Sequence, residues 1–214
     1  MKNKLVKKNK NQYLLFPIEK TSGILPKLQA ADIVFVHTKK SLLRFLIRKV
    51  TKSYWDHVAL VLFPRDIQKG RYYNQVIEAV DPGGVEIHKL DKYLKNPEKY
   101  DIGIKRLSTI GVETRKRITA FMLMNVDAPY YKLSFFRFVL ASISRTFSEN
   151  LLGRQRFCCS GFVQRAFYEA ANWDEREKLI FRTEYLSPME LQDITTPGDI
   201  ARSPKGDWIY NQKV

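Results

Sequence analysis

The stretch HVALVLF, residues 57–63, decides how this 214-residue chain folds. Successive side chains of an extended strand point to opposite faces, and in this stretch both faces are apolar after the first residue. A strand with two apolar faces is covered on both sides and lies inside a sheet. We therefore predict a central strand at 57–63, with His57 as the polar residue at its start.

Other elements are expected on both sides of this strand. Short apolar runs bounded by turn residues predict strands, at residues 31–37, 75–80, 85–90 and 100–107. Apolar residues at helical spacing predict helices, at residues 41–51, 112–126, 133–147 and 159–171. A strand and helix, a meander of strands and then further helices indicate an α+β fold in one domain.

The helix expected at 41–51 is amphipathic. Arg44 and Arg48 lie on one side of its wheel, opposite a broad apolar arc, made of Leu42, Leu43, Phe45, Leu46, Ile47 and Val50. Such a face commonly packs on the core. Together with the apolar segment 133–147 and the basic N-terminal residues, it could instead form a membrane-facing surface, where each basic side chain contributes roughly 1 kcal/mol near an anionic leaflet.

The chain carries a net charge of +15, with 37 Lys and Arg against 22 Asp and Glu. Residues 1–23 read as a basic flexible tail, followed by a domain at 24–214. The charge favours a polyanionic partner such as nucleic acid, an anionic membrane or an acidic substrate. Nucleic acid is not expected, because aromatic residues are not interleaved with Lys or Arg for base stacking. The oligomeric state is left open.

Two cysteines imply no disulfide framework, so a reducing cytoplasm is the expected location. No apolar run approaches the roughly 18–20 residues of a membrane-spanning helix, and the basic start lacks the apolar core of a signal peptide. We expect a cytoplasmic protein, peripheral at a membrane if the amphipathic surface is used. The cysteines and the three histidines lack the spacing of metal ligands, so neither metal nor cofactor is expected.

Cys158 and Cys159 are adjacent, and they would form only a strained disulfide, because consecutive Cα atoms lie about 3.8 Å apart. Either both are small buried residues, or one is a nucleophile. Cys159 opens the helix at 159–171, whose dipole lowers a thiol pKa from ~8.5 only to about 7–8. Ser160 is expected to help satisfy the first N–H groups of this helix. A thiolate at neutral pH needs a further cation, usually an imidazolium.

Glu78 interrupts the apolar face that Val76 and Val80 form on the strand at 75–80. A buried carboxylate needs a partner, unless this is an edge strand with Glu78 in solvent. His57, which opens the predicted central strand, is the other polar residue that looks out of place on such a strand.

His37, at a surface turn, and His88, which looks exposed, are poorer candidates than His57. Three residues stand where the pattern calls for apolar ones: Cys159 at a helix start, and His57 and Glu78 on apolar strands. A site in which Cys159 is the nucleophile, His57 its base and Glu78 the orienting acid explains all three positions together.

The chain resembles a known family over about residues 24–200. The segments that carry the resemblance are, in order, ADIVFVH, WDHVALVL, QVIEAV…GGVEIHKL, YDIGIKRL, DAPYY, FCCSGFVQRAF and TPGDI. They are similar to the circularly permuted NlpC/P60 branch of papain-like enzymes, in which the histidine precedes the cysteine. That branch includes permuted papain-like amidases and resembles the lecithin:retinol acyltransferase group.

The resemblance implies an antiparallel sheet or small barrel packed against helices. It matches the family's nucleophile to Cys159, its histidine to His57 and its third polar residue to Glu78, and it leaves Cys158 as a packing residue. Two positions depart from the family pattern. Asp56 precedes the histidine where a small residue is usual, although its side chain should point to the opposite face from His57. Gly161 stands where a larger residue is common.

The function implied by the resemblance is that of a cysteine hydrolase working through a thioester. Amide bonds and acyl-ester bonds are both open as substrates, and so is transfer to an acceptor other than water. Small molecules, peptides and lipids are all possible substrates. The alternative is a catalytically inactive papain-like module that binds a lipid, a peptide or another anionic ligand.

Overall fold

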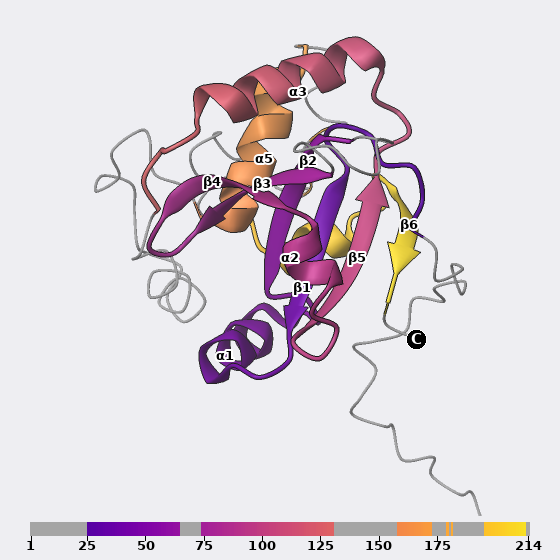
Figure 1. Ribbon diagram of the computed structural model, residues 1–214. Helices are drawn as coiled ribbons and strands as arrows, with labels where there is room; N and C mark the ends of the chain where they lie inside the picture. Colours follow the sequence, from indigo (N-terminus) through magenta and orange to yellow (C-terminus); the bar gives the residue numbers. More distant parts are fainter. Residues whose placement is uncertain are drawn as a thin grey trace, which may run out of the picture.

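The structure is a computed structural model that describes residues 25–64, 74–130, 158–172, 179, 181 and 195–212. A sheet stands at its centre, with α3 and α5 on one face and α2 on the other (Figure 1). The elements follow the order β1 (Ile33–Thr38), α1 (Leu42–Thr51), β2 (His57–Phe63), β3 (Gln75–Val80), β4 (Gly84–Lys89), α2 (Asp91–Leu94), β5 (Tyr100–Arg106), α3 (Val112–Met124), α5 (Cys159–Ala170), α8 (Pro197–Arg202) and β6 (Asp207–Asn211).

The six strands form one antiparallel sheet in the order β4-β3-β2-β1-β5-β6. The sheet is open, because β4 and β6 lie at its two edges. The expected α+β fold with an antiparallel sheet is thus confirmed, and the alternative of a small barrel is not what the described strands form. β2 lies between β3 and β1, as its two apolar faces predict.

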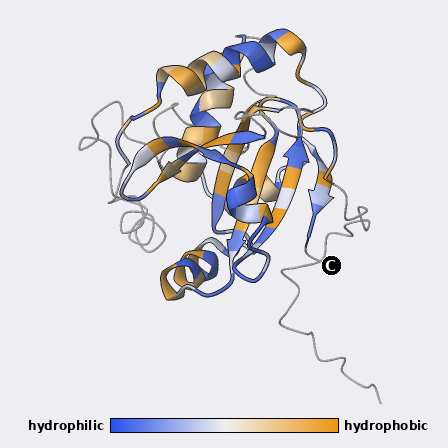
Figure 2. Ribbon diagram, in the orientation of Figure 1, coloured by the Kyte–Doolittle hydropathy of each residue, from blue (hydrophilic) through white to orange (hydrophobic). Residues whose placement is uncertain are grey.

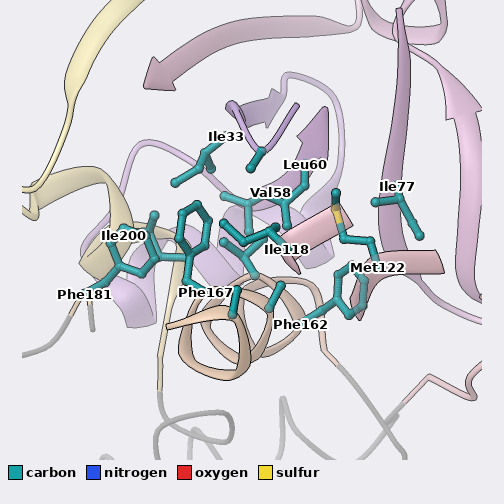
Figure 3. Packing of buried hydrophobic residues seen from close by; sticks show 14 of the residues in the cluster. Ile33, Val58, Leu60, Ile77, Ile118, Met122, Phe162, Phe167, Phe181 and Ile200 are labelled. Atoms are coloured by element: carbon teal, nitrogen blue, oxygen red, sulfur yellow. The ribbon is translucent and has the colours of Figure 1, made fainter. Parts of the chain in front are cut away.

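Each face of β2 packs on a different apolar cluster. Val58 and Leu60 point toward α5, where they meet Phe162 and Phe167 (Figure 3). Val61 belongs to the cluster on the other face of the sheet, which also includes residues of α2. Because α5 lies directly against β2, its first residue is held near the start of that strand.

The helix expected at 41–51 forms as α1, but its orientation differs from that of a core helix. None of its residues is buried. Its arginines face the body of the protein and its largest apolar side chains are exposed, among them Leu42 and Phe45. In Figure 2 this helix shows hydrophobic residues at the outside of the molecule.

Three short elements have no counterpart among the ranges predicted from the sequence. α2 has four residues, α8 has six, and β6 extends the sheet beyond β5. The predicted tail at 1–23 and the predicted helix at 133–147 lie outside the described residues. Within the described ranges, no helix has the length and apolar character needed to cross a membrane.

Candidate active site

Cys158 and Cys159 occupy the N-terminus of α5 and have different surroundings. Cys158 is the N-cap residue, and its Sγ accepts a hydrogen bond of 3.3 Å from the backbone N–H of Gly161. The expectation that Ser160 caps this helix is wrong: its hydroxyl donates to the backbone oxygen of Thr195 at 2.7 Å instead. The helix therefore begins two residues earlier than a Ser160 cap would require, with Cys159 as its first residue.

Cys159 is 8% exposed and interacts with His57 and with the backbone of Val58, the first two residues of β2. Burial alone would raise the pKa of its thiol. The charge of His57 and a hydrogen bond with its ring lower this pKa, and so do the charge of Arg44 and a hydrogen bond with the backbone of Val58. Together they outweigh the effect of burial, so the pKa of Cys159 is lowered. This is the electrostatic signature of a thiolate beside an imidazolium.

His57 connects the thiol to Glu78. Burial would lower the pKa of the imidazole, but the negative Cys159 sulfur and the Glu78 carboxylate outweigh it and raise the pKa of His57 to about 9. Nε2 of the ring is hydrogen-bonded to Oε2 of Glu78. The hydrogen bond to Cys159 therefore falls to Nδ1, and the imidazole is held at both nitrogens.

Glu78 is fully buried on the sheet face that packs on α2. Its Oε2 also accepts a hydrogen bond of 2.5 Å from the Tyr93 hydroxyl. Its Oε1 lies 2.9 Å from Nδ1 of His88 and 3.0 Å from Nζ of Lys92. Burial would raise the pKa of Glu78, but these partners and His57 hold the pKa far below its usual range. Glu78 is thus an ionised, fully hydrogen-bonded carboxylate and not an edge residue in solvent.

His88 is closer to the site than its sequence suggested. Its ring is about one-third exposed and bridges two carboxylates, with Nδ1 on Glu78 and Nε2 3.1 Å from Oε2 of Glu86. Glu78 pairs directly with Glu86 across β3 and β4. That register follows from a three-residue turn at 81–83, since Val80 pairs with Gly84. A four-residue turn at 81–84, as the sequence suggested, would shift the pairing by one residue, so the sequence alone did not reveal this contact.

Lys92, Tyr93 and Tyr130 were missed altogether. The first two lie on α2, whose four residues give no periodic signal. Burial, followed by the charges of Cys159 and Cys158, raises the pKa of Tyr130. The DAPYY segment that ends in this region was part of the family resemblance, but no role was assigned to its tyrosines.

Asp56 and His37 lie apart from this arrangement. Asp56 is buried, and its carboxylate binds the backbone N–H and hydroxyl of Thr38 at 2.8 and 2.9 Å, together with Arg48. His37 stacks on the ring of Tyr54 and contacts that residue's backbone oxygen at 2.8 Å. Asp56 therefore holds α1 to β1 and does not orient His57.

The assembled chain of groups can carry out nucleophilic chemistry. The lowered pKa of Cys159 favours its thiolate form, and the raised pKa of His57 favours an imidazolium beside it, which can give a proton to a leaving group. The Glu78 carboxylate fixes the ring and stabilises its positive charge. The three residues that the sequence suggested are brought together from three separate elements, β2, β3 and α5.

The fold is similar to that of a solved structure, the metalloprotein yiiX from Escherichia coli O157:H7. The two chains superpose with a TM-score of 0.58 at 16% identity, over 87% of this chain and 98% of that one. Among the described residues of this chain, no group of three or more His, Cys, Asp and Glu is arranged to hold a metal ion. We therefore derive no chemical step through a metal. No curated protein matches the chain.

One family model matches residues 27–210, nearly all of the expected domain. The family is described as a permuted papain-like amidase enzyme, YaeF/YiiX, C92 family. The match agrees with a histidine on an early strand and a cysteine at the start of a late helix, the order seen in β2 and α5. The chain thus belongs to the C92 family of permuted papain-like amidases.

Proposed function

We propose that the protein is a cysteine hydrolase in which Cys159 is the nucleophile, His57 the general acid and base, and Glu78 the residue that positions His57. The observation that carries the proposal is the buried His57 ring, which is shared between the Cys159 thiol and the Glu78 carboxylate. The family assignment supports the same type of activity.

The reaction begins with attack of the Cys159 sulfur on the carbonyl carbon of an amide or acyl ester. The imidazolium of His57 protonates the leaving nitrogen or oxygen as its bond to carbon breaks, which leaves a thioester. His57, now neutral, takes a proton from water as the water oxygen attacks the thioester carbonyl. The carboxylic acid leaves and the thiolate–imidazolium pair is restored.

Charge on the carbonyl oxygen requires hydrogen-bond donors near the sulfur. The backbone N–H of Cys159, at the start of α5, is one donor. Tyr130 is a second: burial and the neighbouring thiol charges raise its pKa, so its hydroxyl keeps its proton and can donate. These donors act in a buried site, where hydrogen bonds to developing charge are stronger than in water.

Trapping of the acyl-enzyme tests the proposal. The full chain is incubated with a p-nitrophenyl acyl ester, quenched in acid and mapped by mass spectrometry. We expect one acyl group on Cys159, released by neutral hydroxylamine as a thioester is. The Cys158→Ser variant should acylate in the same way, because Cys158 serves as a helix cap that serine can replace.

Acylation of Cys158, or of neither cysteine, would contradict the assignment. If neither thiol is acylated and both have ordinary reactivity, the inactive module that binds a lipid, peptide or other anionic ligand becomes the better account.

A further inference from the structure

The orientation of α1 is fixed by its polar face. Nη1 of Arg48 lies 2.5 Å from Oδ2 of Asp56 and 2.9 Å from the backbone oxygen of Thr38. Arg44 reaches the backbone oxygen of Asp56 at 3.3 Å. Since the Asp56 side chain is completely buried, the two arginines hold α1 to the body of the protein and turn its opposite face outward.

The outward face is apolar. Leu42 is 78% exposed, Leu43 55%, Phe45 51% and Leu46 42%. Large apolar side chains that are exposed singly need no explanation, but a contiguous group of them indicates a surface that binds something. Here four of them share one arc of a helix of ten residues. We call these four side chains the α1 apolar face.

Basic residues surround the α1 apolar face. Residues 39–52 contain six Lys and Arg and no Asp or Glu. Arg44 and Arg48 are engaged with Asp56, whereas Lys40, Lys49 and Lys52 are exposed. A short helix with Leu and Phe on one side and lysines at its borders has the composition of a helix that lies in a membrane interface.

We propose that α1 docks the protein on an anionic lipid bilayer, with the α1 apolar face among the acyl chains and the lysines against the headgroups. A second copy of the chain fits less well, because it would bring two clusters of like charge together. A helix of ten residues is also only about 15 Å long, too small for the roughly 800 Å² that each partner contributes to a stable interface.

Docking through α1 would bring the candidate active site to the bilayer. Arg44 of α1 donates a hydrogen bond to the backbone oxygen of Asp56, the residue directly before His57. The charge of Arg44 also helps to lower the pKa of the Cys159 thiol. The start of β2, which carries His57, is therefore in direct contact with α1. This step rests on the proposed function. If that function holds, the substrate is an amide or acyl ester carried by a membrane lipid.

Sedimentation of the full chain with lipid vesicles tests the docking. The vesicles contain phosphatidylglycerol and phosphatidylcholine in equal parts, or phosphatidylcholine alone. We expect binding to the anionic vesicles and at least about tenfold weaker partitioning of the double variant Leu43→Ser/Phe45→Ser, because it removes apolar area that would enter the bilayer. The basic tail is unchanged in this variant, so the loss reports on α1.

Matched variants separate the possible outcomes. Val112→Ser/Met124→Ser removes two apolar side chains of α3 that are more exposed than Leu43 and Phe45, and this variant should bind as the wild type does. Cys159→Ala should also bind normally, so that docking is judged independently of catalysis. Equal binding of the α1 variant and the wild type would overturn the proposal. The proposal would also be overturned if the wild type formed a dimer in the absence of vesicles and the α1 variant did not. That result would show that the α1 apolar face joins two copies of the chain.

Discussion

Replacing Cys159 with alanine is expected to lower the hydrolysis of an activated acyl ester by at least about 10³-fold, because no other group can form the thioester. Cys158 lies next to it in sequence but serves the helix: its Sγ accepts the hydrogen bond from Gly161. The measurement is the steady-state release of p-nitrophenol from a p-nitrophenyl acyl ester by the purified full chain.

Cys158→Ser is the matched control for Cys159→Ala. Serine at an N-cap accepts the same backbone hydrogen bond, so turnover should stay within about threefold of the wild type. Equal losses in the two variants would mean that the start of α5, and not the Cys159 sulfur, is what the reaction needs. Full turnover in Cys159→Ala would remove Cys159 from the mechanism.

Glu78→Gln is expected to affect both stability and rate. The amide cannot balance the positive charges of His57 and Lys92, so two cations lose their buried carboxylate. Breaking a buried ion pair by removing one partner costs about 3 kcal/mol or more of unfolding free energy. The rate should fall by about 10²-fold or more, because the His57 imidazolium is no longer stabilised or oriented.

Glu86→Gln is the matched control, since Glu86 pairs across the hairpin with Glu78 but is partly exposed and contacts His88. Denaturant unfolding should show little change for this variant.

The effect of Glu78→Gln should also depend on pH. The pKa of Glu78 is lowered from the ordinary value of 4.5, so its contribution is present above that pH and is lost as the pH falls.

The contribution of His57 has the opposite sign. Its pKa is raised from 6.5 to about 9, so its stabilising interactions are fully present below pH 6.5 and are lost as the pH rises through about 9. For the two glutamate variants, equal free energies of unfolding for Glu78→Gln and Glu86→Gln at neutral pH would contradict the stabilising role assigned to the hydrogen bonds and ion pairs of Glu78.

The elements that build the site were predictable because each carries a strong local pattern. Two apolar faces marked β2 as a central strand, and helical spacing marked α5. Against these patterns, His57, Glu78 and Cys159 stood out as polar or reactive residues in apolar positions. The structure brings all three together, so the anomalies had a common physical cause.

What the sequence did not reveal depends on contacts between distant residues. The helical wheel placed Arg44 and Arg48 opposite the apolar arc of α1, but it could not show that a buried Asp56 draws the arginines inward. Tyr93 reaches Glu78 from a four-residue helix that has no periodic signal. The edge strand β6 was missed because five residues of mixed polarity do not resemble a buried strand.

The most direct test of the thiolate–imidazolium pair is the pH dependence of iodoacetamide alkylation, with peptide mapping to identify the modified cysteine. The wild type, His57→Ala and the control variant His37→Ala are compared, because His37 lies on Tyr54 and outside the candidate site. We expect Cys159 to react rapidly below pH 7 in the wild type and in His37→Ala, since His57 lowers the pKa of the thiol. In His57→Ala the reaction should become fast only above about pH 8, as for an ordinary thiol. Identical profiles with and without His57, or selective alkylation of Cys158, would contradict the proposed site.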